Sequence, residues 1–246
     1  MLKRLKEARL LVPAVMTLAG LAVLLALGTW QLQRRAWKND LVGKIAARAQ
    51  AEPVSLSRAL ELSRWQDIEY LRVHVKGQLE GTESHHYAPN RSGPGYHVYS
   101  PLRTDDGLLV LVNRGFVPEA LKDPGLRARG QSAGDTELTG LVRMPRERGW
   151  FVPPTDLVRN RFFWPDYPNM LGTARAAGKG QWNPVPFFID VEAKPANPGG
   201  WPKGGVTNLD IPNRHLEYAI SWYGLALTLA GVFGAFAWGR RQAGVA

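Results

Sequence analysis

"LLVPAVMTLAGLAVLLALGT", residues 10–29, carries no charge over about 20 positions, the length that a helix needs to cross a bilayer. A second charge-free stretch, "YAISWYGLALTLAGVFGAFAW", covers residues 218–238. Trp30 ends the first stretch, and aromatic residues lie at both ends of the second. Aromatic residues in these places are typical of the interface between membrane and water. The sequence therefore predicts two transmembrane helices.

Basic residues lie outside both stretches: Lys3, Arg4, Lys6 and Arg9 precede the first, and Arg240 and Arg241 follow the second. By the positive-inside rule, this predicts that both termini are cytoplasmic. Arg34, Arg35 and Lys38 on the other side of the first span argue against it, although a long middle segment is exported whatever its charge. Only nine residues precede the first span, too few for a mitochondrial presequence, so we expect a multi-pass protein of the bacterial inner membrane.

A cleaved signal peptide is the alternative interpretation of the first span, because "ALG" at residues 26–28 resembles a small-residue cleavage site. The apolar stretch is long for a signal peptide and two arginines follow it closely, so an uncleaved anchor is favoured. The predicted organisation has five parts: a cytoplasmic N-terminus (1–9), a first transmembrane helix (10–32), an extracytoplasmic domain (33–213), a second transmembrane helix (214–238) and a cytoplasmic C-terminus (239–246).

Composition limits the partners and the chemistry. The chain of 246 residues has a net charge of +10 and no cysteine, so disulfides, thiolate catalysis and cysteine-ligated metals are excluded. Lys and Arg are scattered, without a basic run, and we therefore expect a lipid bilayer rather than nucleic acid as the partner.

The middle segment alternates between apolar and polar residues, as half-buried strands do. "LRVHVKGQL" from Leu71 has this period of two, and further strands are predicted at "YHVYSPL" (from 96), "LLVLVNRGFV" (from 108), "TELTGLVR" (from 136) and "PFFIDV" (from 186). "DDG" at residues 105–107 predicts a hairpin turn. Helices are predicted at residues 34–50 and, after a Ser N-cap, at 55–64. The predicted fold class is an α+β membrane protein, with two transmembrane helices flanking a mainly antiparallel, barrel-like β domain.

The histidines of this segment suggest no metal site. His85 and His86 are adjacent in sequence, and adjacent residues on a strand would point to opposite faces and could not chelate one ion; an exposed pair is favoured. His74 alternates with Arg72 and Lys76 and is expected to face solvent. The chain also lacks G-x-S-x-G, H-E-x-x-H and a phosphate-binding glycine loop, so we do not expect an enzyme.

His215 differs because it lies at the mouth of the second apolar span, in "NRHLEYAISWYGLAL", residues 213–227. Asn213 is a good N-cap for the helix that begins there. His215, Ala219, Trp222 and Ala226, followed by Ala230, share one helical face, whose small residues permit close approach of another helix or of a flat ligand.

Arg34, Arg35 and Arg214 are expected at about the depth of His215, because the outer ends of both spans share one membrane surface. An imidazole beside an apolar groove, with guanidinium groups nearby, has the parts that bind a haem: an axial ligand and partners for two propionates. From residue chemistry alone, the favoured interpretation is that His215 caps the helix and anchors it at the interface.

Several motifs resemble the Surfeit-locus-protein-one (Surf-one, also Shy-one) family of cytochrome c oxidase assembly factors. They are "GTWQLQR" at 28–34, "GYHVYSPL" at 95–102, "LVLVNRGFVP" at 109–118, "FFWPD" at 162–166 and "PNRHLEYAISWYGLAL" at 212–227. The sequence departs from the family pattern at Ser221, where threonine is usual, and at "PPTD", residues 153–156.

The resemblance implies a non-enzymatic protein that binds haem a and helps its delivery to oxidase subunit I. It implies that His215 is the ligand of the haem iron and that haem a synthase is a further partner. Tyr218 and Trp222 would then flank the macrocycle, with Trp30 beside it, and Arg34, Arg35 or Arg214 would pair with the propionates. Two alternatives stay open: an assembly scaffold that contacts oxidase subunits without a cofactor, and a membrane-anchored hydrolase with a dispersed active site.

Overall fold

The computed structural model describes residues 10–80, 82–91, 93–131, 134–177 and 183–243. The predicted cytoplasmic segment 1–9 and residues 244–246 of the predicted C-terminal segment lie outside them. The chain forms two compact units: a helix unit made of residues 1–44 and 210–246, and a β domain made of residues 45–209. Each unit is described separately.

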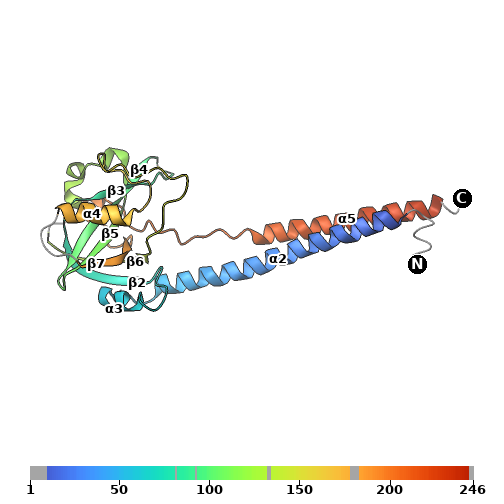
Figure 1. The fold of residues 1–246 in the computed structure, drawn as a ribbon, viewed down its shortest axis with the longest axis horizontal. Coiled ribbons are helices and arrows are strands. Elements are labelled where there is room, and N and C mark those ends of the chain that lie inside the picture. Colours follow the sequence, from blue (N-terminus) through green and yellow to red (C-terminus); the bar gives the residue numbers. More distant parts are fainter. Residues whose placement is uncertain (1–9, 81, 92, 132–133, 178–182, 244–246) are drawn as a thin grey trace. The chain divides into compact units, whose positions relative to one another are not determined.

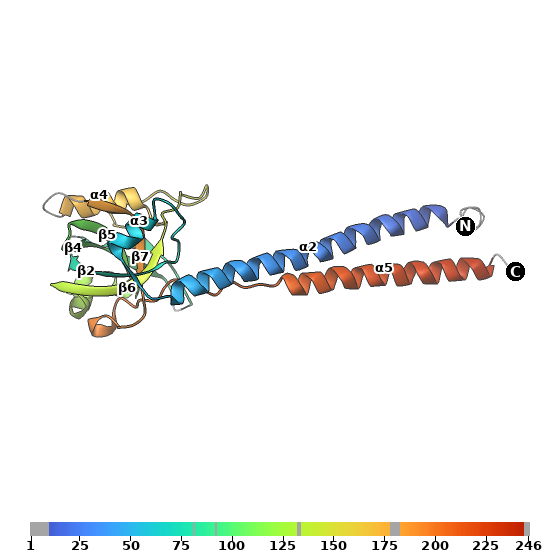
Figure 2. The ribbon, with the colours of Figure 1, turned by 90° about the horizontal axis from the view of Figure 1, so that it is seen from below.

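The helix unit contains α5 (His215–Ala243) and the part of α2 (Leu11–Gln50) up to residue 44. Both helices are long and apolar enough to cross a membrane, which fits a membrane-anchored protein. They lie side by side and antiparallel, so that the beginning of α2 and the end of α5 are at the same end of the pair (Figures 1 and 2). The helix predicted at 34–50 is confirmed as a direct continuation of the first span.

Small residues let the two helices approach closely. A Cβ atom on Gly28 would lie 2.9 Å from the Tyr223 ring, and one on Gly20 would lie 3.0 Å from Leu229. Ala219 and Ala226 on α5 are almost fully buried. Most other apolar side chains of the pair are exposed within the chain, as expected for residues that face lipid.

Among its described residues, the β domain forms one sheet of seven strands. They are β1 (Val54–Ser55), β2 (Arg72–Leu79), β3 (Ser84–Tyr87), β4 (Gly95–Thr104), β5 (Leu108–Pro118), β6 (Asp135–Arg143) and β7 (Asn183–Val191). The helical elements are α3 (Leu56–Leu62), α4 (Tyr167–Ala177) and the 3-10 turns η1 (Glu119–Leu121), η2 (Pro124–Gly130) and η3 (Pro198–Gly200). All five strands predicted from the sequence are therefore present, and the Ser55 hydroxyl caps α3 as expected.

The order of the strands is β1-β2-β6-β7-β5-β4-β3. Strand β2 also pairs with β4, so the pairings run from β2 through β6, β7, β5 and β4 and back to β2. The sheet is mixed, because the β1–β2 and β5–β7 pairs are parallel and the other pairs are antiparallel. The expectation of a mainly antiparallel sheet thus holds only in part, and a barrel-like form stays a prediction. The parallel β5–β7 pair follows from the connection between these two strands. The chain passes through β6 and α4 before it enters β7, which is long enough to bring β7 back in the same direction as β5.

The largest apolar core lies between the strands and α3, and includes Val110, Val112, Phe187 and Ile189. A second cluster forms under α4, where Met170 packs with Phe162 and Phe188. Neither β3 nor α4 was predicted. The four residues of β3 are too few to show a period, and α4 owes its position to this cluster.

Candidate functional site

His215 is the first residue of α5, and its ring faces α2. Its Nδ1 lies 2.7 Å from Oε1 of Gln31. Because an amide oxygen only accepts hydrogen bonds, Nδ1 donates in this contact, and in the neutral ring Nε2 is then the nitrogen with the lone pair. A partner on one imidazole nitrogen commonly orients the other nitrogen toward a metal. The geometry therefore gives His215 the tautomer and the orientation of a possible metal ligand.

Polar contacts between the two helices fix the start of α5. The Asn213 side-chain amide donates to the Arg35 carbonyl at 3.3 Å and to Asn39 Oδ1 at 2.7 Å, and its own Oδ1 accepts the His215 N–H at 3.4 Å. Lys38 donates to the Pro212 carbonyl at 2.6 Å. Asn213 thus binds the first N–H of α5 from two residues upstream, while Arg214 stands directly before the helix, and His215 is held beside α2.

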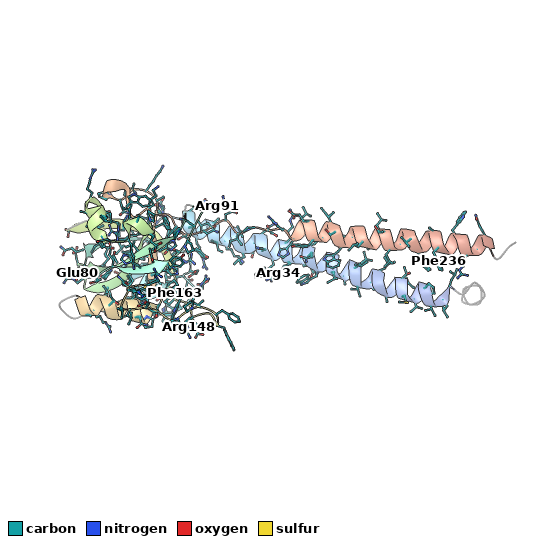
Figure 3. The ribbon with its side chains drawn as sticks, turned by 90° about the horizontal axis from the view of Figure 1, so that it is seen from above. Arg34, Glu80, Arg91, Arg148, Phe163 and Phe236 are labelled. Atoms are coloured by element: carbon teal, nitrogen blue, oxygen red, sulfur yellow. The ribbon has the colours of Figure 1, made fainter. Side chains whose placement is uncertain are left out.

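The other residues predicted to contact haem lie near the start of α5, or on the part of α2 beside it. The side chains of Trp30 and Tyr218 are 53% and 56% exposed, whereas Trp222 is half-buried. Arg34 lies on α2 close to the start of α5 (Figure 3), with its guanidinium 3.9 Å from the centre of the Trp37 ring. The remaining two arginines are Arg35, which is half-buried, and Arg214, which is exposed.

The small-residue face of α5 packs against α2 and does not form a groove for a ligand. Ala219 is 1% exposed and Ala226 is 4% exposed, while Ala230 is exposed. Between the helices, Tyr223 covers Gly28 and its hydroxyl lies 3.1 Å from the Thr29 hydroxyl. The sequence left a helix and a flat ligand open as occupants of this face, and the structure assigns α2 to it.

An apolar cavity of about 330 Å³ lies between the helices near the opposite end of the pair. Its lining includes Leu10, Leu21, Phe233 and Arg241. None of the predicted haem contacts lines it, so this cavity is separate from the His215 site.

In the β domain, His85 belongs to a buried charged cluster rather than to an exposed pair, so that expectation was wrong. Only 4% of His85 is exposed, and its ring lies 3.3 Å from the Glu83 carboxylate. Glu83 also pairs with Arg114 at 3.2 Å and with Arg127. Burial alone would raise the pKa of Glu83, but hydrogen bonds from His85 and Arg127 lower it to about 2. The cluster is internally satisfied, which is typical of a structural element.

The predictions for the other histidines are confirmed where they concern the faces of strands. His86 points to the opposite side of β3 from His85, toward His97 on β4. His74 is 40% exposed at its side chain and pairs with Glu137 at 2.7 Å. Within the described ranges there is no group of three or more His, Asp or Glu side chains that could hold a metal ion.

Comparison with known proteins agrees with the motifs. The model of the SURF1 family matches residues 18–227. The chain belongs to the SURF1 family. It is 36% identical over 219 residues to Surfeit locus protein 1 of Homo sapiens, a match that covers 81% of this chain and 69% of the relative. It is 33% identical over 233 residues to the protein of the same name from Gallus gallus, covering 87% and 70%. A SURF1-like protein of Monosiga brevicollis is 36% identical over 223 residues, covering 85% and 81%.

Sequence reasoning missed Gln31 as a member of the His215 site. The signal was present, because Gln31 follows the first charge-free stretch directly and lies inside the motif at 28–34. What the sequence did not supply is the vertical register of the two helices, which alone brings Gln31 to the level of His215.

Proposed function

We propose that this SURF1-family protein acts in the assembly of cytochrome c oxidase by holding haem a at His215 and delivering it to subunit I. The observation that carries the proposal is the contact between His215 Nδ1 and Gln31, which in the neutral ring leaves Nε2 as the nitrogen with the lone pair. When bound, haem a would supply an iron that accepts an imidazole nitrogen and two propionates that pair with guanidinium groups. Haem a synthase is the proposed donor.

The residues around His215 fit such a ligand in their chemistry. The exposed rings of Trp30 and Tyr218 offer apolar surface for a macrocycle, and the half-buried Trp222 follows about one turn further along α5. Arg34, Arg35 and Arg214 supply the positive charge for propionates. Because Ala219 and Ala226 are covered by α2, the ligand would lie outside the helix–helix contact rather than within it.

The test is the visible spectrum of the full-length protein, purified in detergent after co-expression with the enzymes that make haem a. Wild type should show a haem band, and His215→Ala should abolish it while membrane insertion is retained, because losing one polar contact at a helix start costs only about 1 kcal/mol. The matched control is His74→Ala, which removes an exposed histidine from the β domain. An unchanged spectrum and full occupancy in His215→Ala would overturn the ligand assignment.

Graded variants examine the surrounding residues. Gln31→Ala should weaken haem binding by about 10- to 100-fold, the usual cost of losing the partner of a metal-ligating histidine. Arg34→Ala should weaken binding less, because charge pairing near water is screened. Trp222→Ala should loosen the site without removing the iron ligand.

An assembly scaffold without a cofactor is the second candidate, and one observation favours it. Trp150 and Phe151 are 99% and 101% exposed on a loop of the β domain, which is unusual for two adjacent aromatic residues and suits contact with another protein. If wild type carries no haem but supports oxidase assembly, and Trp150→Ala with Phe151→Ala abolishes that support, the scaffold function is correct.

We further propose that the protein lies in the bacterial inner membrane with both termini in the cytoplasm. The antiparallel helix pair supports a common side for both termini (Figure 2), and the basic residues before α2 and at the end of α5 favour the cytoplasm. The test is a reporter enzyme that is active only outside the cytoplasm. It should be inactive when fused after Ala246 and active when inserted at Asn90. The reverse result would contradict this orientation.

A further inference from the structure

A cavity of about 380 Å³ in the β domain contains two histidines that the proposed haem site does not use. His86 and His97 both line it, together with Tyr99, Met144 and Asp190. We name it the His86–His97 cavity. It lies wholly within residues 45–209, whereas His215 belongs to the helix unit.

The two imidazoles are brought together by strand pairing. His86 on β3 lies directly opposite His97 on β4, so both side chains leave the same face of the sheet. Their ring centres are 5.7 Å apart, and the ring planes cross at 71°. One metal ion with bonds of about 2 Å to a nitrogen of each ring would span roughly this separation. The cross-strand pair thus places two imidazoles on one face of the sheet, which the adjacent His85 and His86 do not.

His86 presents a lone pair without a competing partner. One of its ring nitrogens is hydrogen-bonded to the Phe163 backbone, while Nδ1 is buried and has no hydrogen-bond partner among the described residues. The Nε2–H is therefore the donor, and Nδ1 is the unprotonated nitrogen. Metal-ligating histidines typically donate their other N–H to a carboxylate or a backbone carbonyl in this way.

Both rings are held in the neutral form that binds metals. Burial and the neighbouring His97 lower the pKa of His86 to about 4. Burial also lowers the pKa of His97 below its ordinary value, with Asp190 opposing the shift. Neither ring is therefore charged near neutral pH, and no proton has to leave before an ion binds.

The other groups in the cavity select the kind of ion. The Asp190 carboxylate already accepts hydrogen bonds from Asn113 at 2.9 Å and from Thr207 at 2.7 Å. Burial raises the pKa of Tyr99 well above its usual value, so its phenol stays protonated. Met144 also lines the cavity and brings a thioether to it.

Two guanidinium groups, Arg143 and Arg146, also line the cavity and disfavour a doubly charged ion. Imidazole nitrogens and a thioether, without a free carboxylate, suit a soft ion of low coordination number. We propose that His86 and His97 bind a monovalent copper ion, Cu(I), with the Met144 thioether as third donor.

The test is an anaerobic titration of full-length, metal-free protein in detergent with Cu(I), in competition with a chromogenic Cu(I) chelator. One ion should bind per chain. His86→Asn and His97→Asn should each lower the affinity by at least about 100-fold, more than the cost of losing an outer partner, and Met144→Leu should lower it less. His74→Asn is the matched control, because His74 pairs with Glu137 and does not line the cavity, and it should bind as wild type does. Circular dichroism checks the fold of each variant.

The choice of ion tests the site without any substitution. Wild type should bind Cu(I) more tightly than Zn²⁺, because imidazole nitrogens and a thioether suit a soft ion. The proposal is overturned by absence of stoichiometric Cu(I) binding, by undiminished binding in the double variant His86→Asn/His97→Asn, or by tighter binding of Zn²⁺ than of Cu(I).

Discussion

The helix unit and the β domain differ in where their polar contacts lie. In the helix unit, the contacts of His215, Asn213 and Lys38 gather where α5 begins, at the end of an apolar stretch. In the β domain, Glu83 and its two arginines lie in the interior, with 8% or less of each residue exposed. The helix unit keeps its polar groups at a boundary, whereas the domain neutralises them inside.

The difference follows from the surroundings that each unit is built for. Lipid is as apolar as a leucine side chain, so the helices gain from close contact at Gly28 and Ala219 rather than from removing apolar surface from water. The β domain excludes water from a conventional core, where a charge is tolerated only if it is paired. A substitution should therefore affect the two units through different mechanisms.

The largest expected effect is the loss of the buried charge in the β domain. Glu83→Gln leaves Arg114 and Arg127 without a carboxylate, and we expect a loss of about 3–5 kcal/mol in the free energy of unfolding. Urea unfolding of the full-length protein in detergent measures it. The control Glu61→Gln breaks an exposed pair with Arg58 and should cost no more than about 0.5 kcal/mol. Equal effects of the two substitutions would show that the cluster is not a structural centre.

The next effect is a dependence of stability on pH in the acid range. In the folded protein the pKa of Glu83 is lowered from 4.5 to about 2. The ionised carboxylate therefore contributes to the free energy of unfolding above pH 4.5, and this contribution is lost as the pH falls toward 2. Between pH 5 and pH 3 the unfolding free energy should fall by about 2 kcal/mol more in wild type than in Glu83→Gln. Parallel pH profiles of the two proteins would contradict the lowered pKa.

A smaller effect is expected in the helix unit from filling the helix contact. Gly28→Leu forces a side chain into the Tyr223 ring and should cost about 1–3 kcal/mol of helix association. The chain has no cysteine, so a Gly20→Cys/Leu229→Cys pair can report the contact by disulfide cross-linking. Cross-linking should fall in the presence of Gly28→Leu and persist with Gly224→Leu, where the space is open. The urea transition of the β domain should not change.

The smallest effect on stability is expected at the exposed aromatic loop. Trp150→Ala and Phe151→Ala remove side chains that contact almost nothing in the folded chain, and each should change the unfolding free energy by less than about 0.5 kcal/mol. Thermal unfolding of the full-length protein measures this. A loss above about 1 kcal/mol would mean that the loop packs against the chain in solution and is not free to meet a partner.

Much of the architecture follows from local patterns. Two charge-free stretches predict α2 and α5, the period of two from Leu71 predicts β2, and Ser55 predicts the cap of α3. These features depend on neighbouring residues, whose spacing is the same in the sequence and in a helix or strand. The motifs at residues 28–34 and 212–227 likewise indicate the family by themselves, because they are continuous stretches of sequence.

The tertiary structure decided what depends on pairing between distant residues. The pairing of His86 with His97, the contact of Gln31 with His215 and the burial of His85 beside Glu83 each require a strand register or a helix register. A change of register by one residue would move every side chain of a strand to the other face, and no local pattern records which partner a strand meets. The sequence by itself determined the two apolar helices, the five longer strands and the family. Packing decided which polar groups meet, because those contacts depend on the register of elements that are distant in the sequence.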